Sequence, residues 1–266
     1  MYKQPFKNTL LGMVLFFVVA PVFGAIQGES VSYTDKDITM EGYLAWDDSS
    51  NKTRPGILVV HEWWGHNDYA RKRARMLAEA GYLAMSIDMY GDGKVAAHPD
   101  QAGAFSSAAM ANLGKAEKRF NAAMQVLNEH PLMLKNKMAA IGYCFGGGVV
   151  LHMARVGTDL KGVASFHGSL AAQVEAEKNQ ISAQVLVLHG ADDPFIPQEK
   201  VKAFETEMKR ANAAFEVIQY PGVTHSFTNP EADEFAKRFS LPLAYNREAD
   251  EKSWQSLKDF LVKVFQ

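Results

Sequence analysis

The single cysteine of the chain stands in a setting that suits a nucleophile. The segment "GYCFG" places Cys144 between Gly142 and Gly146, after an apolar run and before the helical pattern "GGVVLHMARVG". A Gly-x-nucleophile-x-Gly sequence between a strand and a helix is typical of a nucleophile elbow, whose sharp turn leaves no space for larger residues at the glycine positions. The N–H groups that open the helix would favour a thiolate, and the Phe145 N–H would be an oxyanion donor.

A buried structural cysteine is the alternative interpretation, since free cysteines are often core residues. A phosphate-binding loop is excluded because the glycines lack the Lys-Ser/Thr pair that such a loop requires. The chain holds no second cysteine, so a thiol-redox protein that cycles through an internal disulfide is excluded as well.

An acid and a histidine follow the cysteine in the order that a hydrolase of this type needs. The segment "VLVLHGADDPFIP" places Asp192 and Asp193 after one apolar strand, and "YPGVTHSFTNP" places His225 after another. Asp193 directly precedes "PFIP", where the loop leaves the sheet, so it is the predicted partner of the histidine. Asp192 is expected to cap the turn. The sequence therefore predicts the catalytic set Cys144, Asp193 and His225.

Short apolar runs alternate with helical patterns along the chain and predict the fold. Helices are expected after residue 67, over about 113–128 and over 248–265, and two short strands flank a polar turn at 34–37. This alternation predicts an α/β fold with a mostly parallel sheet of about eight strands, its first pair antiparallel and helices on both faces. Functional sites of such sheets form beyond the carboxyl ends of strands. The residues at those ends are Glu62, Asp88, Cys144, His167, Asp193 and His225.

Residues 1–24 have the pattern of a secretory signal peptide. Lys3 and Lys7 provide the positive region, Leu10–Ala20 the apolar region, and cleavage is expected after Gly24. An uncleaved membrane anchor is the alternative, but the apolar run is shorter than the roughly 18 to 20 residues that span a bilayer. We therefore expect an exported protein, periplasmic or secreted.

The remaining residues, 25–266, have the length of a single α/β domain. The formal net charge of −2 becomes about −4 when the two lysines of the signal peptide are removed, and no basic face is apparent. We expect no nucleic-acid partner, no stable membrane span after cleavage, and a monomer that acts on a small molecule.

The combination of "GYCFGG", "DPFIP" and "HSF", in this order and at this spacing, resembles the dienelactone hydrolase family of α/β-hydrolases. The resemblance covers nearly the whole chain after the signal peptide, and it is specific because most α/β-hydrolases carry serine at the elbow. It implies the α/β-hydrolase fold and cleavage of a small ester or lactone, as in carboxymethylenebutenolidase, through a Cys-His-Asp triad. It implies no cofactor.

The segment "HEWWGHND" is similar to the family's segment after its third strand. This match implies that Glu62 contacts the cysteine in the resting enzyme and gates the thiol, and that Trp63 offers a second oxyanion N–H. An ion pair of Glu62 with Arg71 or Arg75, at the start of the next helix, is the alternative.

Two arginines that the family uses to bind a substrate carboxylate have no counterpart here. Gly91 and Asp92 stand near the first position, and Thr228, Asn229 and Pro230 near the second. We therefore expect a neutral or hydrophobic ester or lactone instead of an anionic dienelactone. A non-catalytic small-molecule binding protein on the same fold is the second function class, but it would need neither the triad nor the elbow glycines.

Aromatic residues near the strand ends are candidates for the substrate pocket. Trp64, Tyr90 and Phe227 are expected to line it beside Trp63, although packing in the core is the alternative for each. His61 and His66 lie across one loop with no third ligand in view, so no metal site is expected.

Overall fold

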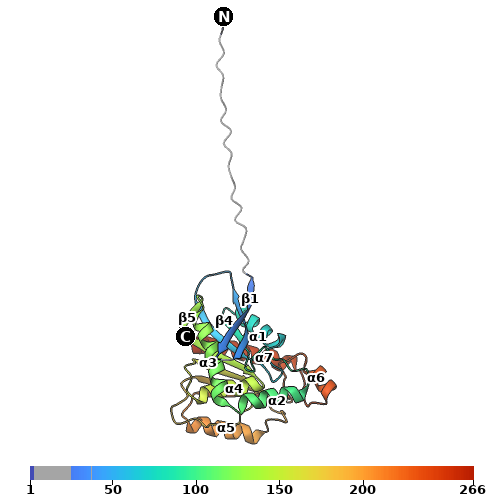
Figure 1. The fold of residues 1–266 in the computed structure, drawn as a ribbon. Coiled ribbons are helices and arrows are strands. Elements are labelled where there is room, and N and C mark those ends of the chain that lie inside the picture. Colours follow the sequence, from blue (N-terminus) through green and yellow to red (C-terminus); the bar gives the residue numbers. More distant parts are fainter. Residues whose placement is uncertain (3–24, 37) are drawn as a thin grey trace.

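The computed structural model describes residues 1–2, 25–36 and 38–266 of the chain (Figure 1). Apart from its first two positions, the predicted signal peptide lies outside the described residues, so the structure does not test it. Among the residues that are described, no helix combines the length and the apolar character that a membrane span requires.

A single eight-stranded sheet forms the centre of the fold. Its strands are β1 (Ile26–Asp35), β2 (Ile38–Asp47), β3 (Arg54–Val60), β4 (Leu83–Ile87), β5 (Met133–Tyr143), β6 (Gly162–Phe166), β7 (Gln184–Gly190) and β8 (Phe215–Tyr220). The strand order is β1-β2-β4-β3-β5-β6-β7-β8. The β1–β2 and β2–β4 pairs are antiparallel and the other neighbours are parallel, which confirms the predicted sheet.

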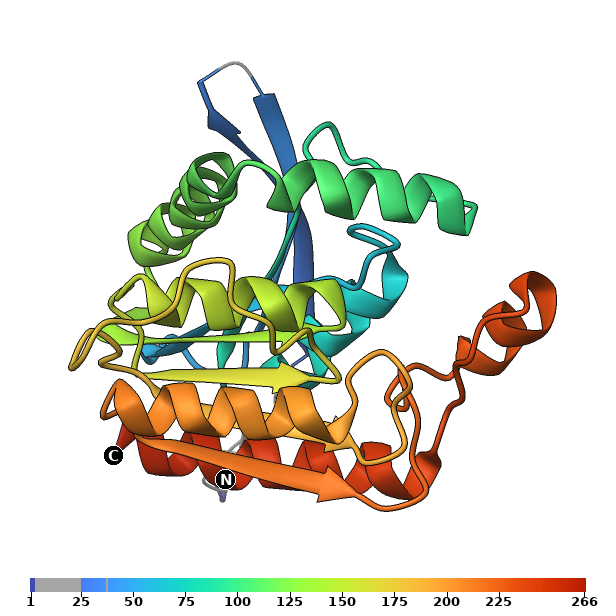
Figure 2. The same cartoon turned by 90° about the horizontal axis from the view of Figure 1, so that it is seen from below.

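Helices cover both faces of this sheet, as predicted. They are α1 (Asp68–Glu79), α2 (Pro99–Met110), α3 (Leu113–Glu129), α4 (Phe145–Arg155), α5 (Gln198–Arg210), α6 (Ala232–Phe239) and α7 (Arg247–Phe265). Leu58 and Val60 of β3 share one core with α3, α4 and α5, whereas Ile57 and Val59 share the other with α1 and α7. Figure 2 shows α3, α4 and α5 on the near side of the sheet. The alternation along β3 is that of a strand buried on both faces.

Helix α1 shows how local sequence shapes these elements. The Asn67 side chain caps it by accepting from the Ala70 N–H at 3.4 Å, and Gly81 follows its end with a φ of +93°. The predicted apolar face, which includes Ala74 and Leu77, is fully buried. The Asn67 cap, the apolar face and Gly81 are all features of the local sequence, and together they define where this helix begins and ends.

Helix α2 has no counterpart among the predicted elements. Its sequence is rich in alanine and serine, and only Ala102 and Ala109 are buried, so it lacks the apolar stripe that marks a core helix. Figure 2 shows α2 and α6 extending on the side to which the β8 arrowhead points. Both helices therefore flank the carboxyl edge of the sheet, where the site is expected.

Candidate active site

The cysteine occupies the sharp turn between β5 and α4. Cys144 has φ 52° and ψ −114°, a strained conformation for a residue with a side chain. A Cβ atom at Gly142 would overlap the carbonyl group of Gly146, and one at Gly146 would overlap the carbonyl of Val60. The Cys144 N–H donates to the Phe166 carbonyl at 3.0 Å, which ties the turn to β6. The predicted elbow geometry is confirmed, and both glycines are required by close backbone approach.

The histidine and one of the two aspartates are in direct contact. Nδ1 of His225 lies 2.7 Å from Oδ2 of Asp193, and both side chains are buried. Oδ1 of Asp193 accepts from the Phe195 N–H at 2.9 Å, so this carboxylate also caps the turn, a role expected of Asp192. Asp192 is exposed. The structure thus places Asp193 at the histidine, as predicted.

The environment of His225 favours the imidazolium form. Burial lowers the pKa of His225, but the negative charge of Cys144 and the hydrogen bonds to Asp193 and Cys144 raise it more, to about 10. An imidazolium between a thiolate and a carboxylate has a partner for each ring nitrogen.

Glu62 lies buried beneath this site and is held by the loop that follows the histidine. The Ser226 hydroxyl donates to Oε1 of Glu62 at 3.2 Å, and Nδ2 of Asn229 donates to Oε2 at 2.6 Å. Burial raises the pKa of Glu62, while these bonds and the nearby His225 lower it in part. Within the described part of the chain, no hydrogen bond joins Glu62 to Cys144.

The alternative partners of Glu62 are engaged elsewhere. Arg71 lies 3.8 Å from the carboxylate of Asp68 in the same helix, and Nε of Arg75 donates to the Tyr43 hydroxyl at 2.7 Å. The ion pair that the sequence left open is therefore not formed. Both oxygens of Glu62 are instead satisfied by neutral side chains.

Phe145 and Trp63 carry the two backbone N–H groups that are predicted to form the oxyanion site. Phe145 is the first residue of α4, so its N–H has no acceptor within the helix. The Trp63 carbonyl accepts from the Tyr90 hydroxyl at 2.9 Å, which fixes this loop. The His61 ring stacks on Phe145 with 5.6 Å between ring centroids. Both Trp63 and Phe145 border the same cavity as Cys144.

That cavity has a volume of about 390 Å³ and opens onto both the thiol and the imidazole. Apart from the histidine it is bordered by uncharged side chains, most of them apolar. The lining residues are Trp63, Ser106, Ser107, Met110, Cys144, Phe145, Ser169, Phe195, Ile196, His225, Leu241 and Leu243. No lysine or arginine is among them, which agrees with the expected neutral substrate.

The predicted pocket residues Trp64, Tyr90 and Phe227 do not border this cavity. Trp64 packs against Phe235 and Phe239, with ring centroids 4.5 and 6.0 Å away. Tyr90 uses its hydroxyl to brace the oxyanion loop, and Phe227 is fully buried. These three aromatic rings are packing residues, which corrects the prediction that they line the pocket.

Several wall residues were missed because they come from segments with weak patterns. Ser106, Ser107 and Met110 lie on α2, and Leu241 and Leu243 follow α6. Their side chains reach the cavity only through the packing of these segments over the sheet edge. Phe195 and Ile196 are the wall residues that a local pattern could have indicated, because they belong to the loop that carries the predicted acid Asp193.

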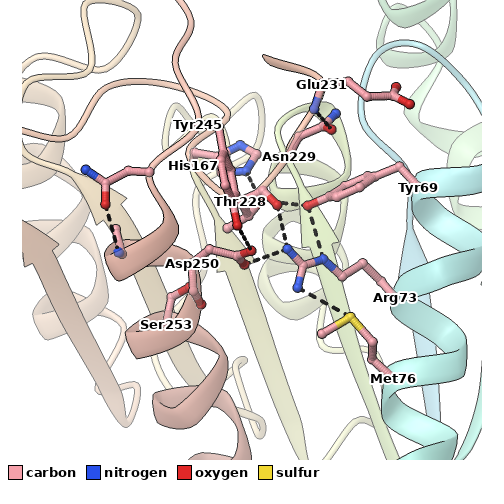
Figure 3. A network of polar contacts seen from close by, with 12 residues as sticks. Tyr69, Arg73, Met76, His167, Thr228, Asn229, Glu231, Tyr245, Asp250 and Ser253 are labelled. Atoms are coloured by element: carbon pink, nitrogen blue, oxygen red, sulfur yellow. Dashed lines mark hydrogen bonds and ion pairs between the residues drawn. The ribbon is translucent and has the colours of Figure 1, made fainter. Parts of the chain in front are cut away.

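A buried polar network anchors the loop after the histidine (Figure 3). The Thr228 hydroxyl lies 2.6 Å from the Tyr69 hydroxyl and 2.8 Å from Nε2 of His167. Nη2 of Arg73 donates to the Thr228 carbonyl and to the Asp250 carboxylate, both at 2.6 Å. The loop is thus fastened to α1, to α7 and to the end of β6, and it cannot shift without breaking buried bonds.

Comparison with known proteins agrees with this arrangement. A sequence profile of the dienelactone hydrolase family matches residues 40–265. The chain belongs to the dienelactone hydrolase family. Its sheet and helices are those of the α/β-hydrolase fold.

The three similar proteins described here align with most of this chain. It is 34% identical to a dienelactone hydrolase-like promiscuous phosphotriesterase from metagenomic libraries, with a TM-score of 0.86 over 91% of this chain and 100% of that one. It is 28% identical over 227 residues to a Salmonella typhimurium protein described as a carboxymethylenebutenolidase, covering 77% and 79% of the two chains. A Klebsiella pneumoniae dienelactone hydrolase structure, 24% identical with a TM-score of 0.75 over 90% and 99% of the chains, shares the fold.

Proposed function

We propose that this protein hydrolyses small neutral esters or lactones through a thioester on Cys144. One observation carries the proposal. Cys144 and His225 open onto one cavity whose other lining side chains are uncharged, and Nδ1 of His225 lies 2.7 Å from Oδ2 of Asp193. A structural cysteine would need neither the strained elbow nor a buried imidazolium beside it.

In the first half of the reaction, the Cys144 thiolate attacks the carbonyl carbon of the substrate. The C=O bond becomes an oxyanion, which the N–H groups of Phe145 and Trp63 stabilise; one such donor is typically worth roughly 3 to 4 kcal/mol. His225 then gives its proton to the departing alkoxide, and the C–O bond breaks. The alcohol leaves and the acyl group remains on sulfur.

In the second half, neutral His225 takes a proton from water, and the hydroxide attacks the thioester carbon. Collapse of the second oxyanion breaks the C–S bond and returns the acid and the thiolate, while the imidazolium is restored. Asp193 orients the ring and stabilises its cation in both halves. The sum is one ester and one water converted to one acid and one alcohol.

Glu62 is proposed to control the reactivity of the thiol. From its place in this structure it acts on His225, because the carboxylate form of Glu62 and the His225 imidazolium stabilise each other. Gating by direct contact would require Glu62 to exchange its bonds to Ser226 and Asn229 for one to Cys144.

The proposed substrates are uncharged because the cavity lining holds no lysine or arginine that could bind a substrate carboxylate. The positions near Gly91 and Thr228 hold no arginine, and the buried Arg73 has its charge paired with Asp250 at 2.6 Å. A thiolate with little base assistance suits acyl groups with good leaving groups, such as enol lactones and aryl esters. Faster turnover of an anionic dienelactone than of its neutral methyl ester would contradict this choice.

Phosphotriesters are a second proposed substrate class. The relative with 34% identity carries this activity in its description, and a neutral apolar cavity suits an uncharged triester. The thiolate would attack phosphorus and displace an aryloxide. Incubation with diethyl p-nitrophenyl phosphate tests this, because a diethylphosphoryl group should then appear on wild-type protein and not on Cys144→Ala.

The decisive experiment follows p-nitrophenyl acetate turnover and intact mass together, in wild type, Cys144→Ala and Cys144→Ser. We expect a transient acetyl adduct and continued release of nitrophenol in wild type alone. A permanent adduct without turnover would contradict the hydrolase and leave a reactive thiol that cannot deacylate. If no adduct and no turnover were found over a panel of aryl esters, the result would favour the non-catalytic binding protein.

Export is also part of the proposal, supported by the signal-peptide pattern of residues 1–24. Expression of the full chain in a bacterium and mass analysis of the periplasmic fraction tests it. A product that begins at Ala25 is expected. Full-length protein retained in the membrane would favour the anchor.

A further inference from the structure

A second cavity, of about 170 Å³, adjoins the first one and shares three wall residues with it: Met110, Phe145 and Ser169. Its other lining residues are Gly148, His152, Arg155, Ala171 and Gln173. The first cavity is mainly apolar, whereas this one carries a guanidinium, an imidazole and an amide. Of its lining residues, the proposed reaction uses only Phe145.

The second cavity runs along α4 away from the nucleophile. Phe145, Gly148, His152 and Arg155 are spaced by three, four and three positions, so they lie on one face of the helix. Seven residues separate Phe145 from His152, which corresponds to roughly 10 Å along the axis. A substrate chain of about eight atoms would cover this distance from the reacting carbonyl.

Arg155 contributes a donor to this cavity and no unpaired charge. Its Nε and Nη2 donate to the two oxygens of Glu207 at 2.9 and 2.8 Å, and Nη2 also donates to the Leu170 carbonyl at 2.9 Å. Arg155 is 2% exposed, and Nη1 is the guanidinium nitrogen that none of these bonds uses. Nη1 is not one of the fully buried polar atoms that lack a partner, so it is accessible from the cavity and can donate to a ligand oxygen.

The second basic group is neutralised in the same way. Nε2 of His152 lies 2.8 Å from Oε1 of Glu117, and Gln173 adds an uncharged amide to the opposite wall. Each potential cation of the cavity thus has its own carboxylate. A carboxylate ligand would therefore find no unpaired cation, whereas an uncharged oxygen needs only a hydrogen-bond donor.

We propose that this second cavity is a subsite for one arm of the substrate, and that it selects an arm ending in an uncharged hydrogen-bond acceptor, such as an ester, lactone, ketone or ether oxygen. The inference rests on the proposed ester hydrolysis and narrows its substrate class to bifunctional esters. A purely apolar arm would offer Arg155 Nη1 no acceptor, and an anionic arm would lose its hydration without gaining an unpaired cation.

Three matched chains of about eight atoms test the proposal. One ends in a methyl group, one in a methyl ester and one in a carboxylate. Each is presented as the acyl part of a p-nitrophenyl ester and, separately, as the alcohol part of an acetate. For one of the two arms we expect kcat/KM for the methyl-ester chain to exceed that for the methyl chain by about five- to tenfold, since the net contribution of one hydrogen bond is of that order. The carboxylate chain should be the slowest.

Two variants test whether the preference for the methyl-ester chain arises in the second cavity. A methyl group at Gly148 would lie 3.4 Å from Cβ of Ser169, so Gly148→Ala narrows the second cavity without a clash, and Gln173→Ala removes one wall amide at an exposed position. Both should bring the ratio of methyl-ester to methyl chain towards one. Gly103→Ala in α2, where an added Cβ meets nothing within 4 Å, is the matched control and should keep the wild-type ratio.

The outcomes separate this inference from the proposed function. Turnover of p-nitrophenyl acetate together with a ratio of one in wild type on both arms would overturn the subsite alone. A preference for the carboxylate chain, or a ratio that survives both cavity variants, would do the same. Loss of turnover on every ester would overturn the proposed hydrolysis, and the subsite with it.

Discussion

Nδ2 of Asn229 donates a hydrogen bond over 2.6 Å to Oε2 of Glu62, a residue 167 positions earlier in the chain. This bond joins the loop after β3, which carries the Trp63 N–H, to the loop after β8, which carries His225. Both ends are buried, so the two halves of the site hold each other in register. It also occupies a carboxylate that the family resemblance assigns to the thiol.

Replacing Glu62 by glutamine should weaken this junction. Glutamine has one side-chain oxygen for two donors, so either Ser226 or Asn229 loses its acceptor, and we expect the free energy of unfolding to fall by about 1 to 3 kcal/mol. Alkylation of Cys144 by iodoacetamide should become slower, because the negative charge that stabilises the His225 imidazolium is gone. Urea titration and intact-mass kinetics measure both effects.

The exposed Glu79→Gln change at the end of α1 is the control for Glu62→Gln. Faster alkylation in Glu62→Gln would instead support gating by direct contact with the thiol. An unchanged alkylation rate would remove Glu62 from the mechanism.

The neighbouring aspartates give a matched pair for the role of the acid. Asp193→Asn should lower kcat for p-nitrophenyl acetate by roughly 10²- to 10⁴-fold, because the amide no longer stabilises the imidazolium at Nδ1 of His225. Asp192→Asn changes the same functional group at the exposed adjacent position, and kcat should stay near wild type. Equal losses in both variants would refute the assignment of Asp193.

The elbow glycines should tolerate no side chain. In Gly142→Ala the new methyl group overlaps the Gly146 carbonyl, so backbone must move, and we expect a loss of several kcal/mol in stability, as for other overpacked sites. Gly103→Ala, at an open position in α2, should be neutral or more stable by up to about 1 kcal/mol. Thermal unfolding followed by circular dichroism compares the two. An unchanged melting temperature in Gly142→Ala would show that the turn is looser than its geometry implies.

The pKa of His225 should depend on the thiol. Since the charge of Cys144 is the largest influence that raises it to about 10, Cys144→Ala should move the pKa of His225 well down, which an NMR titration of the imidazole measures. The raised pKa also has a consequence for stability. The folded protein holds this proton more tightly than the unfolded chain, so its contribution is complete below pH 6.5 and is lost as pH rises towards 10.

His225→Gln should remove that part of the pH dependence. The difference in unfolding free energy between wild type and His225→Gln should therefore shrink from pH 6.5 to pH 10. A difference that grows over this range would contradict the raised pKa.

Local sequence was enough to predict most of the framework. The apolar runs of β3 and β5, the glycines at 142 and 146, and the position of Asp193 before "PFIP" each act over a few residues. Chain order then brings the ends of successive parallel strands to one edge. For these reasons the sheet, the elbow and the Asp193–His225 contact agree with expectation, while nucleophilic catalysis by Cys144 stays a prediction.

The substrate walls and the partner of Glu62 depend on contacts between distant segments, and only the tertiary structure decided them. Trp64 and Phe227 have the residue types of pocket residues, yet packing turns them into the core, while the weakly patterned α2 supplies Met110. Periodicity reports whether a side chain faces protein or water. It does not report which distant segment the side chain packs against, and the packing between distant segments determines the shape of a cavity.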